Sequence, residues 1–142
     1  MPAGQERTST QSRPDVLTFT TPPGSAVTLF AGTVATELDI VADGSEFDIA
    51  CTLSRVGSNG RVFAVADGYR RVTVPGMVCL QMRASCLTLQ SGEAVRLSVA
   101  VAAFPAFPVN PGTGEDPTRA RAVDPRIITL HLRHGARLTI GA

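Results

Sequence analysis

The sequence predicts an all-β protein, folded as a jelly-roll-type antiparallel β-sandwich. Apolar and polar residues alternate with period two in several segments. Turns that contain glycine separate these segments at short intervals. No segment shows the apolar spacing of an amphipathic helix. The chain has 142 residues, which suits one domain with a substantial buried core.

Four segments alternate most clearly, and we expect each to form a half-buried antiparallel strand. Polar residues such as Asp48, Arg96 and His131 occupy the face opposite the apolar set. The apolar sets are Val34, Leu38 and Ile40 in residues 33–41; Phe47, Ile49, Cys51 and Leu53 in 46–56; Val95, Leu97, Val99 and Val101 in 94–102; and Ile128, Leu130 and Leu132 in 126–134.

Glycine turns of hairpin type are expected between the strands. They fall at residues 42–46, 57–60, 66–69, 90–93 and 133–136. The segment 77–90 changes phase partway, which predicts a bulge or bend near Ala84 and Ser85. The pattern as a whole indicates eight to ten strands. We expect residues 1–12 to form a disordered arm or linker, and residues 13–142 to form one domain.

Composition excludes several classes of partner. The formal net charge is +1, so nothing draws the protein to nucleic acid or to an anionic membrane. No apolar run reaches the ~20 residues of a membrane helix, and the N-terminus lacks the apolar core of a secretion signal. We therefore expect a cytoplasmic protein. All thirteen basic residues are arginine, which is typical of a GC-rich bacterial coding sequence.

The sequence offers no recognisable catalytic or metal site. A nucleophile elbow of the form G-x-S-x-G is missing, and Ser45 and Ser58 fall in turns. The two histidines, His131 and His134, would lie on opposite faces of a strand, and no Cys-x-x-Cys is present. We therefore predict no catalytic residue, no metal and no cofactor.

The remaining polar and sulfur-containing residues favour structural roles. Cys51, Cys79 and Cys86 lie in apolar patterns and are expected to be buried as small hydrophobic residues. Glu37 and Asp39 share the outer face of a strand, where acidic residues normally serve solubility. The chain has no tryptophan and one tyrosine, which argues against a carbohydrate-binding surface built on aromatic platforms.

Three stretches together resemble a known family, the C-terminal non-catalytic domain of X-prolyl dipeptidyl aminopeptidases and cocaine-esterase-type acyl hydrolases. They cover nearly the whole chain, and "FPAFPVNPGTG" is the most specific block. The stretches are "RPDVLTFTTPP" (13–23), "EFDIACTLSRVGSNGRVFAVADGYRRV" (46–72) and "LTLQSGEAVRLSVAVAAFPAFPVNPGTGE" (87–115).

The resemblance implies a galactose-binding-like jelly roll that follows an α/β-hydrolase domain in a larger enzyme. The catalytic triad of such enzymes lies upstream, so no catalytic residue carries over and the chain alone would not be an enzyme. An α/β-hydrolase catalytic domain, in cis or in trans, is the partner that the resemblance implies. Packing, shaping of the substrate cleft and oligomerisation are the expected roles. The alternative is a stand-alone ligand- or carbohydrate-binding module.

Two sets of residues match or depart from the family pattern. Asp67, Gly68 and Arg71 fit the family's Asp-Gly-x-x-Arg turn. Arg96 is retained before the "RL" strand, although the family's histidine is replaced there. Ala106 and Val109 stand where the family has polar residues, which puts a family-typical contact with the hydrolase domain in doubt.

The proline-rich stretch from residue 104 to 117 carries the clearest interface hypothesis. Proline fixes φ and lacks a donor, so this loop is held extended. We expect Phe104 and Phe107 to be buried and to close one end of the sandwich, with Asn110 in a capping turn. The loop either only seals the core or docks another domain. Because Val109 makes this region less polar, we also predict a homodimer through residues 104–117 or the strand 94–102.

Overall fold

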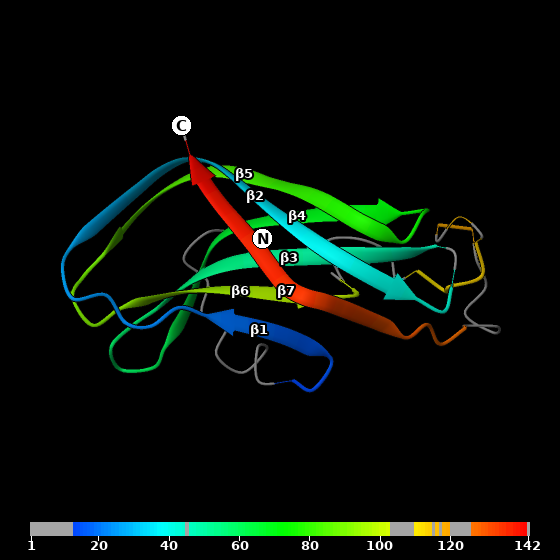
Figure 1. The fold of residues 1–142 in the computed structure, drawn as a ribbon, viewed down its shortest axis with the longest axis horizontal. Coiled ribbons are helices and arrows are strands. Elements are labelled where there is room, and N and C mark those ends of the chain that lie inside the picture. The colour runs from blue at the N-terminus through cyan, green and yellow to red at the C-terminus, as the bar shows by residue number, and fades with distance from the viewer. Residues whose placement is uncertain are drawn as a thin grey trace.

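The computed structural model describes residues 13–44, 46–102, 110–114, 116, 118–119 and 126–141. They form two facing antiparallel β-sheets, so the predicted all-β sandwich is confirmed (Figure 1). Within this part of the chain there are seven strands, fewer than the eight to ten expected, and no helix that could cross a membrane. The arm predicted over residues 1–12 lies outside the described residues, and the galactose-binding-like subtype stays a prediction.

Each sheet is built from strands far apart in the sequence. We call the four-stranded sheet A and the three-stranded sheet B, and Figure 1 shows sheet B in front of sheet A. Sheet A has the order β1 (Val16–Thr20), β6 (Ala94–Ala100), β3 (Phe47–Val56) and β4 (Val62–Val72); sheet B has the order β5 (Gly76–Leu89), β2 (Thr28–Ala42) and β7 (Leu130–Gly141).

The core lies between the sheets and follows the predicted alternation. The inward residues of β2 and β3, such as Leu38 and Leu53, are at most 1% exposed. Val95, Leu97 and Val99 of β6 are also buried, whereas Val101 lies beyond the strand and is 46% exposed. Period-two spacing therefore assigned the inward face of these strands correctly.

Two of the expected turns are wrong. Residues 66–69 lie inside β4, and residues 133–136 lie inside β7. The φ angle of Gly135 is 76°. The pairing passes from Leu38–Ala136 to Asp39–Arg133, so this glycine lies in a β-bulge within the strand. A similar shift between the pairs Gly32–Ser85 and Val34–Met82 confirms the predicted bulge near residues 84–85.

The outer faces of the two sheets differ, which the sequence did not predict. On sheet B the outer residues Glu37 and Asp39 form ion pairs with exposed arginines of β7. On sheet A the outer residues Asp48, Ser54 and Ser98 are only 3%, 0% and 6% exposed. The expectation of half-buried strands is therefore wrong for β3 and β6. Alternation shows which residues share a face, but not whether that face is covered.

Gly68 allows β4 and β5 to approach closely where the two sheets meet. A Cβ atom at this position would lie 2.4 Å from Leu80 Cδ2 and 2.7 Å from the Gln81 carbonyl oxygen. The pairing of Cys51 with Gly68 places Gly68 on the inward face of sheet A. This glycine is therefore required by sheet packing and not by a turn.

We expect Gly68→Ala to lower the free energy of unfolding by roughly 1–3 kcal/mol, because the Gln81 backbone cannot move aside as a flexible side chain would. The matched control is Gly141→Ala, whose Cβ would meet nothing within 4 Å and should change stability by less than about 0.5 kcal/mol. Urea denaturation measures both. Equal midpoints for the two variants would contradict the packing role of Gly68.

Candidate functional site

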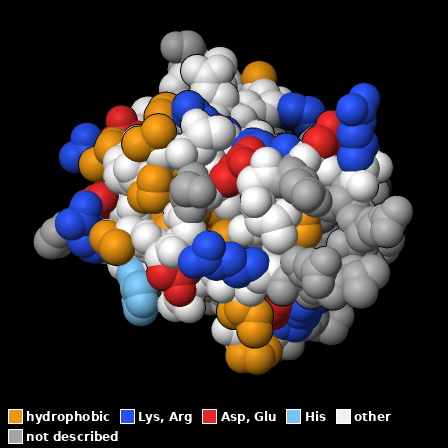
Figure 2. Space-filling view, turned by 90° about the vertical axis from the view of Figure 1, so that its right-hand side faces the viewer, with side chains coloured by type: hydrophobic (Ala, Val, Ile, Leu, Met, Phe, Trp, Pro, Cys, Tyr) orange, Lys and Arg blue, Asp and Glu red, His pale blue; other side chains and the backbone are white. Residues whose placement is uncertain are grey.

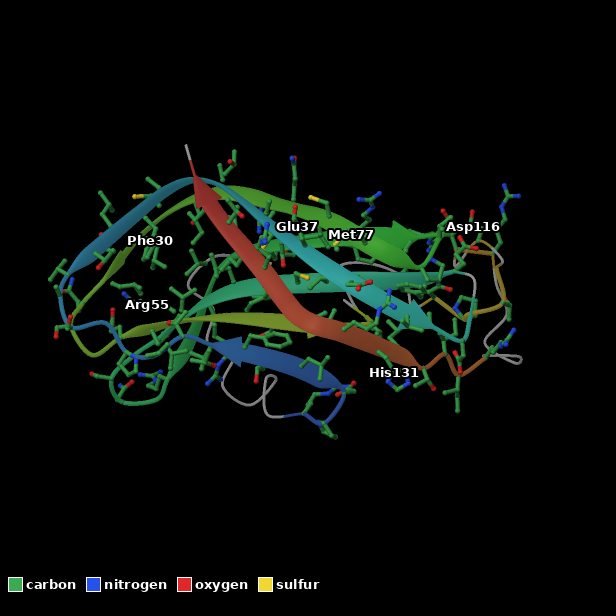
Figure 3. The ribbon with its side chains drawn as sticks, viewed as in Figure 1. Phe30, Glu37, Arg55, Met77, Asp116 and His131 are labelled. Atoms are coloured by element: carbon green, nitrogen blue, oxygen red, sulfur yellow. The ribbon has the colours of Figure 1, made fainter. Side chains whose placement is uncertain are left out.

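A polar cluster lies on the outer face of sheet A, at the end where β3 begins and β4 ends. We call it the Asp48 cluster, and it comprises Glu46, Asp48, Tyr69, Arg71 and Asn110. The end that carries it also holds the segment with Asp116, far from Phe30 and Arg55 at the opposite end (Figure 3). A buried carboxylate at its centre requires partners, because an unpaired buried charge is strongly unfavourable.

Strand register brings Asp48 and Arg71 together. They pair directly across β3 and β4, so their side chains leave the sheet on the same face. Arg71 Nε donates to Asp48 Oδ1 at 3.0 Å, and Nη2 donates to Oδ2 at 3.5 Å. Glu46 Oε1 lies 3.9 Å from the same Nε atom. The guanidinium thus compensates the charge of a carboxylate that is only 3% exposed.

Asn110 attaches a distant segment to the same carboxylate. Its Nδ2 donates to Asp48 Oδ1 at 3.1 Å, across 62 positions of sequence. Its Oδ1 accepts a hydrogen bond from the Gly112 amide at 2.9 Å, which closes an Asx turn. The two ends of one amide side chain therefore fix both the position and the local shape of the segment 110–114.

The other side of this segment rests on the approach to β7. The Arg126 amide donates to the Pro111 carbonyl at 2.7 Å. Gly112 has a φ of 73°, and a Cβ there would lie 2.7 Å from the Arg126 carbonyl oxygen. Nearby, Asp43 Oδ1 accepts from the Thr129 amide at 2.8 Å. Segment 110–114 is therefore held between sheet A and the residues that lead into β7.

Tyr69 completes the cluster and is the single tyrosine of the chain. It pairs with Ala50 and lies diagonally across from Asp48. Burial raises the pKa of Tyr69 to about 12, and the hydrogen bond and negative charge of Asp48 act in the same direction. The phenol is therefore kept neutral and bound to the carboxylate.

The residues that the sequence singled out lie in different places in the structure. The structure joins Arg71 and Asn110 through Asp48, whereas Asp67 pairs with Arg83 of β5. The expected Asp-Gly-x-x-Arg turn is wrong, because Asp67, Gly68 and Arg71 all lie within β4. Phe104, Phe107 and Val109 lie outside the described residues.

Sequence reasoning missed Glu46, Asp48 and Tyr69 as members of a site. Asp48 looked like an ordinary solvent-facing residue because it alternates with the core residues Phe47 and Ile49. A usable signal was the charge itself: an acidic residue near the start of one hairpin strand faces "YRR" near the end of the other.

The cysteines divide into two kinds. Cys51 is 1% exposed, and burial raises the pKa of its thiol to about 12, so it is an inert core residue. Cys79 and Cys86 are exposed on β5, so the prediction that all three are buried is wrong. The phase of β5 explains this, since Leu80 and Leu87 take its inward positions.

The histidine and carboxylate side chains of the described residues have structural settings. His131 is exposed on β7 opposite Val41 (Figure 3). No three His, Cys, Asp or Glu side chains in the described ranges come together as metal ligands. Asp48 already accepts hydrogen bonds from Arg71 and Asn110, which suits a structural anchor better than a general base.

Acidic and basic side chains intermingle across this end of the molecule, while hydrophobic side chains gather at its upper left and at the bottom (Figure 2). A mixed surface of this kind suits either solvent or a polar interface between domains. The Asp48 cluster can hold a surface segment in one defined conformation.

We expect Asp48→Ala to cost roughly 3 kcal/mol of stability, because it removes the acceptor of Arg71 and Asn110 and leaves them poorly compensated. The matched control is Asp39→Ala, which breaks the 2.8 Å pair with the exposed Arg133 side chain and should cost about 0–1 kcal/mol. Chemical denaturation of both variants tests this. A loss for Asp48→Ala no larger than for Asp39→Ala would show that the cluster is not an anchor.

The absorbance of the single phenol should titrate with a midpoint near pH 12 in the folded protein and near pH 10 in denaturant. Since the pKa is higher in the folded state, the stabilisation is complete below pH 10 and is lost as the pH rises from about 10 to 12. Asp48→Asn should move the folded midpoint toward 10. A folded midpoint near 10 in the unmodified protein would contradict this environment for Tyr69.

Solved structures of larger hydrolases contain a region with this fold. A selenomethionine-labelled α-amino acid ester hydrolase superposes with a TM-score of 0.83 at 22% identity, covering 97% of this chain and 27% of that one. An aminopeptidase from a marine sediment archaeon, Thaumarchaeota archaeon, gives 0.83 at 19% identity, covering 92% and 25%. A CocE/NonD family hydrolase from Staphylococcus aureus gives 0.60 at 12% identity, covering 89% and 28%.

The chain thus spans about a quarter of the length of these structures. No curated protein sequence matches it. One family profile, however, matches residues 2–139, almost the full length of the chain, and its description agrees with the resemblance carried by the three sequence stretches. The chain belongs to the family of the X-Pro dipeptidyl-peptidase C-terminal non-catalytic domain.

Proposed function

We propose that this domain packs against an α/β-hydrolase catalytic domain and shapes one side of its substrate cleft, with the end that carries the Asp48 cluster lying at the interface. The observation that carries the proposal is the fixed position of segment 110–114. Asp48 and the Arg126 amide hydrogen-bond to it from two sides, and the Gly112 amide closes an Asx turn within it. A surface segment held in one conformation loses little entropy when a partner binds it.

The family supports the identity of the partner. Members of this family are non-catalytic domains, and the similar structures are hydrolases about four times as long as the matched region. The parent activity we propose is hydrolysis of acyl esters, amino-acid esters or Xaa-Pro peptide bonds. The reaction would take place on the catalytic domain, and this chain would supply no catalytic residue.

The predicted homodimer interface stays a prediction, and the structure narrows where on strand 94–102 it could lie. Strand β6 lies between β1 and β3 and is hydrogen-bonded on both edges. Residues on both of its faces are buried, including Leu97 and Ser98. Residues 94–100 therefore offer little surface to a second copy, whereas Val101 and Ala102 beyond the strand are exposed. The other half of that prediction, residues 104–117, falls largely outside the described residues.

The alternative of a carbohydrate-binding module is weakened by the position of Tyr69. Sugar-binding sandwiches commonly present tyrosine or tryptophan rings as platforms. The chain has no tryptophan, and its one tyrosine is tied to Asp48 inside the cluster. No observation of the structure favours this function over the non-catalytic hydrolase domain.

The genomic neighbourhood and one assay test the proposal. We expect the coding sequence to lie in frame with, or next to, a segment encoding an α/β-hydrolase domain with a Ser-Asp-His triad. That hydrolase should turn over an acyl ester with this domain present, and at least tenfold less with Asp48→Ala, while Asp39→Ala leaves turnover unchanged. The proposal fails if the hydrolase is fully active without the domain, or if the purified domain alone turns over the ester.

A further inference from the structure

The two sheets are unequal in width on one side of the sandwich. Sheet A has four strands and sheet B has three in the described residues. At that side β1 is the last strand of sheet A, and β7 is the last strand of sheet B. In Figure 1, β1 lies beyond β7 at the lower edge of the molecule.

The inward face of β1 is left open by this inequality. Leu17 and Phe19 pair with Val99 and Leu97 of β6 and therefore share their face, which is the face toward the core. Yet Leu17 is 49% exposed and Phe19 is 37% exposed, whereas Val99 and Leu97 are 6% and 4% exposed. Two large apolar side chains thus point toward the core side but remain substantially exposed.

The inward residues of β7 show the same incomplete burial. Leu132 and Ile140 pair with Ile40 and Val34 of β2, which are 2% and 1% exposed, but they are themselves only partly buried. β7 is hydrogen-bonded to β2 along one edge, and no described strand pairs with its other edge. We call the surface formed by Leu17, Phe19, Leu132, Leu138 and Ile140 the open flank.

We propose that the open flank accepts an extended segment of the hydrolase partner as a fourth strand of sheet B, hydrogen-bonded to the free edge of β7. The inference rests on the proposed function for the source of the segment. An exposed strand edge supplies the backbone donors and acceptors, and the apolar surface beneath it receives alternate side chains. The segment therefore carries apolar residues at every second position.

Charge determines the residues at the remaining positions. The outer face of β7 carries the exposed His131 together with Arg133 and Arg137, whose side chains are 54% and 77% exposed. Each arginine contacts one carboxylate of β2, and a guanidinium has donors left for a second. The segment thus carries carboxylates on the face opposite its apolar residues.

Charge argues against one other occupant, and sequence pattern argues against a second. A second copy paired antiparallel through β7 would bring two arginine-bearing outer faces side by side, and like charges across strands are destabilising. The N-terminal residues 1–12, MPAGQERTSTQS, have no alternating apolar residues to cover Leu17 and Phe19. An acidic, alternating strand from the partner is the occupant that fits both surfaces.

Two synthetic peptides of about ten residues test the site, one alternating valine with glutamate and the other alternating valine with lysine. Fluorescence anisotropy with the full chain should show the glutamate peptide binding at least tenfold more tightly. Hydrogen exchange should slow at alternate amides of β7 when that peptide is bound. Equal affinities, or an unchanged exchange pattern in β7, overturn the proposal.

Two variants distinguish binding at the open flank from nonspecific binding to exposed apolar residues. Leu17→Asp should weaken the glutamate peptide at least tenfold, and because Leu17 is half exposed the variant should still fold, which circular dichroism checks. Met77→Asp, at a 72% exposed apolar residue on the outer face of sheet B, should leave binding unchanged. Equal weakening by both variants overturns the site, as does a homodimer that Leu17→Asp dissociates.

The two proposals can fail separately. If the hydrolase needs this domain but its association is insensitive to Leu17→Asp, the open flank is not its binding site and the proposed function stands. If the glutamate peptide binds as described but the hydrolase works fully without the domain, the strand site stands and the proposed function falls.

Discussion

The carboxylate of Asp48 connects three parts of the chain at one end of the sandwich. Strand β3 carries it, Arg71 of β4 compensates its charge, and Asn110 fixes the segment that follows the proline-rich stretch. Each contact depends on the others, because an acceptor buried to this degree is stable only when it is fully paired. The shape of the surface proposed to face a catalytic domain therefore depends on one buried ionic group.

Much of the fold could be predicted because the inward residues alternate strictly. Val34, Leu38 and Ile40 lie on the core side as expected. The charge pattern pointed to this pair of strand ends, but which arginine faces Asp48 could not be predicted, because the register depends on a bulge. If the pairing near the 57–60 turn, such as Val56 with Val62, continued without a shift, Asp48 would lie opposite Arg70. The shift between Leu53 and Ser54 moves Arg71 there instead, and such a one-residue change reverses the face of every later side chain.

Two glycines were assigned the wrong structural role from the sequence. Sequence reasoning treated Gly68 and Gly135 as turn residues because glycine most often marks a turn. One allows close contact between the sheets, and the other adopts a positive φ at a bulge within β7. Local sequence does not distinguish these uses, since what decides between them is the position of Leu80 and Gln81 on another strand.

One flank of the sandwich is closed and the other is open. Where β4 meets β5, Gly68 brings the sheets together, and Arg70 donates a hydrogen bond to the Cys79 carbonyl. Where β1 and β7 end the sheets, Leu17 and Phe19 remain exposed. This asymmetry gives the domain two distinct surfaces: a fixed polar end, and an apolar side with a strand edge that no described strand pairs with.

A double-mutant cycle between Asp48 and Asn110 tests the central claim most directly. The stabilities of Asp48→Ala, Asn110→Ala and the double variant are measured by urea denaturation against the unmodified chain. If the carboxylate holds segment 110–114, the two effects are coupled by about 1 kcal/mol or more, because the second substitution removes a contact that is already lost. Effects that add to within about 0.3 kcal/mol would show that Asp48 and Asn110 act independently, and the anchor would not exist.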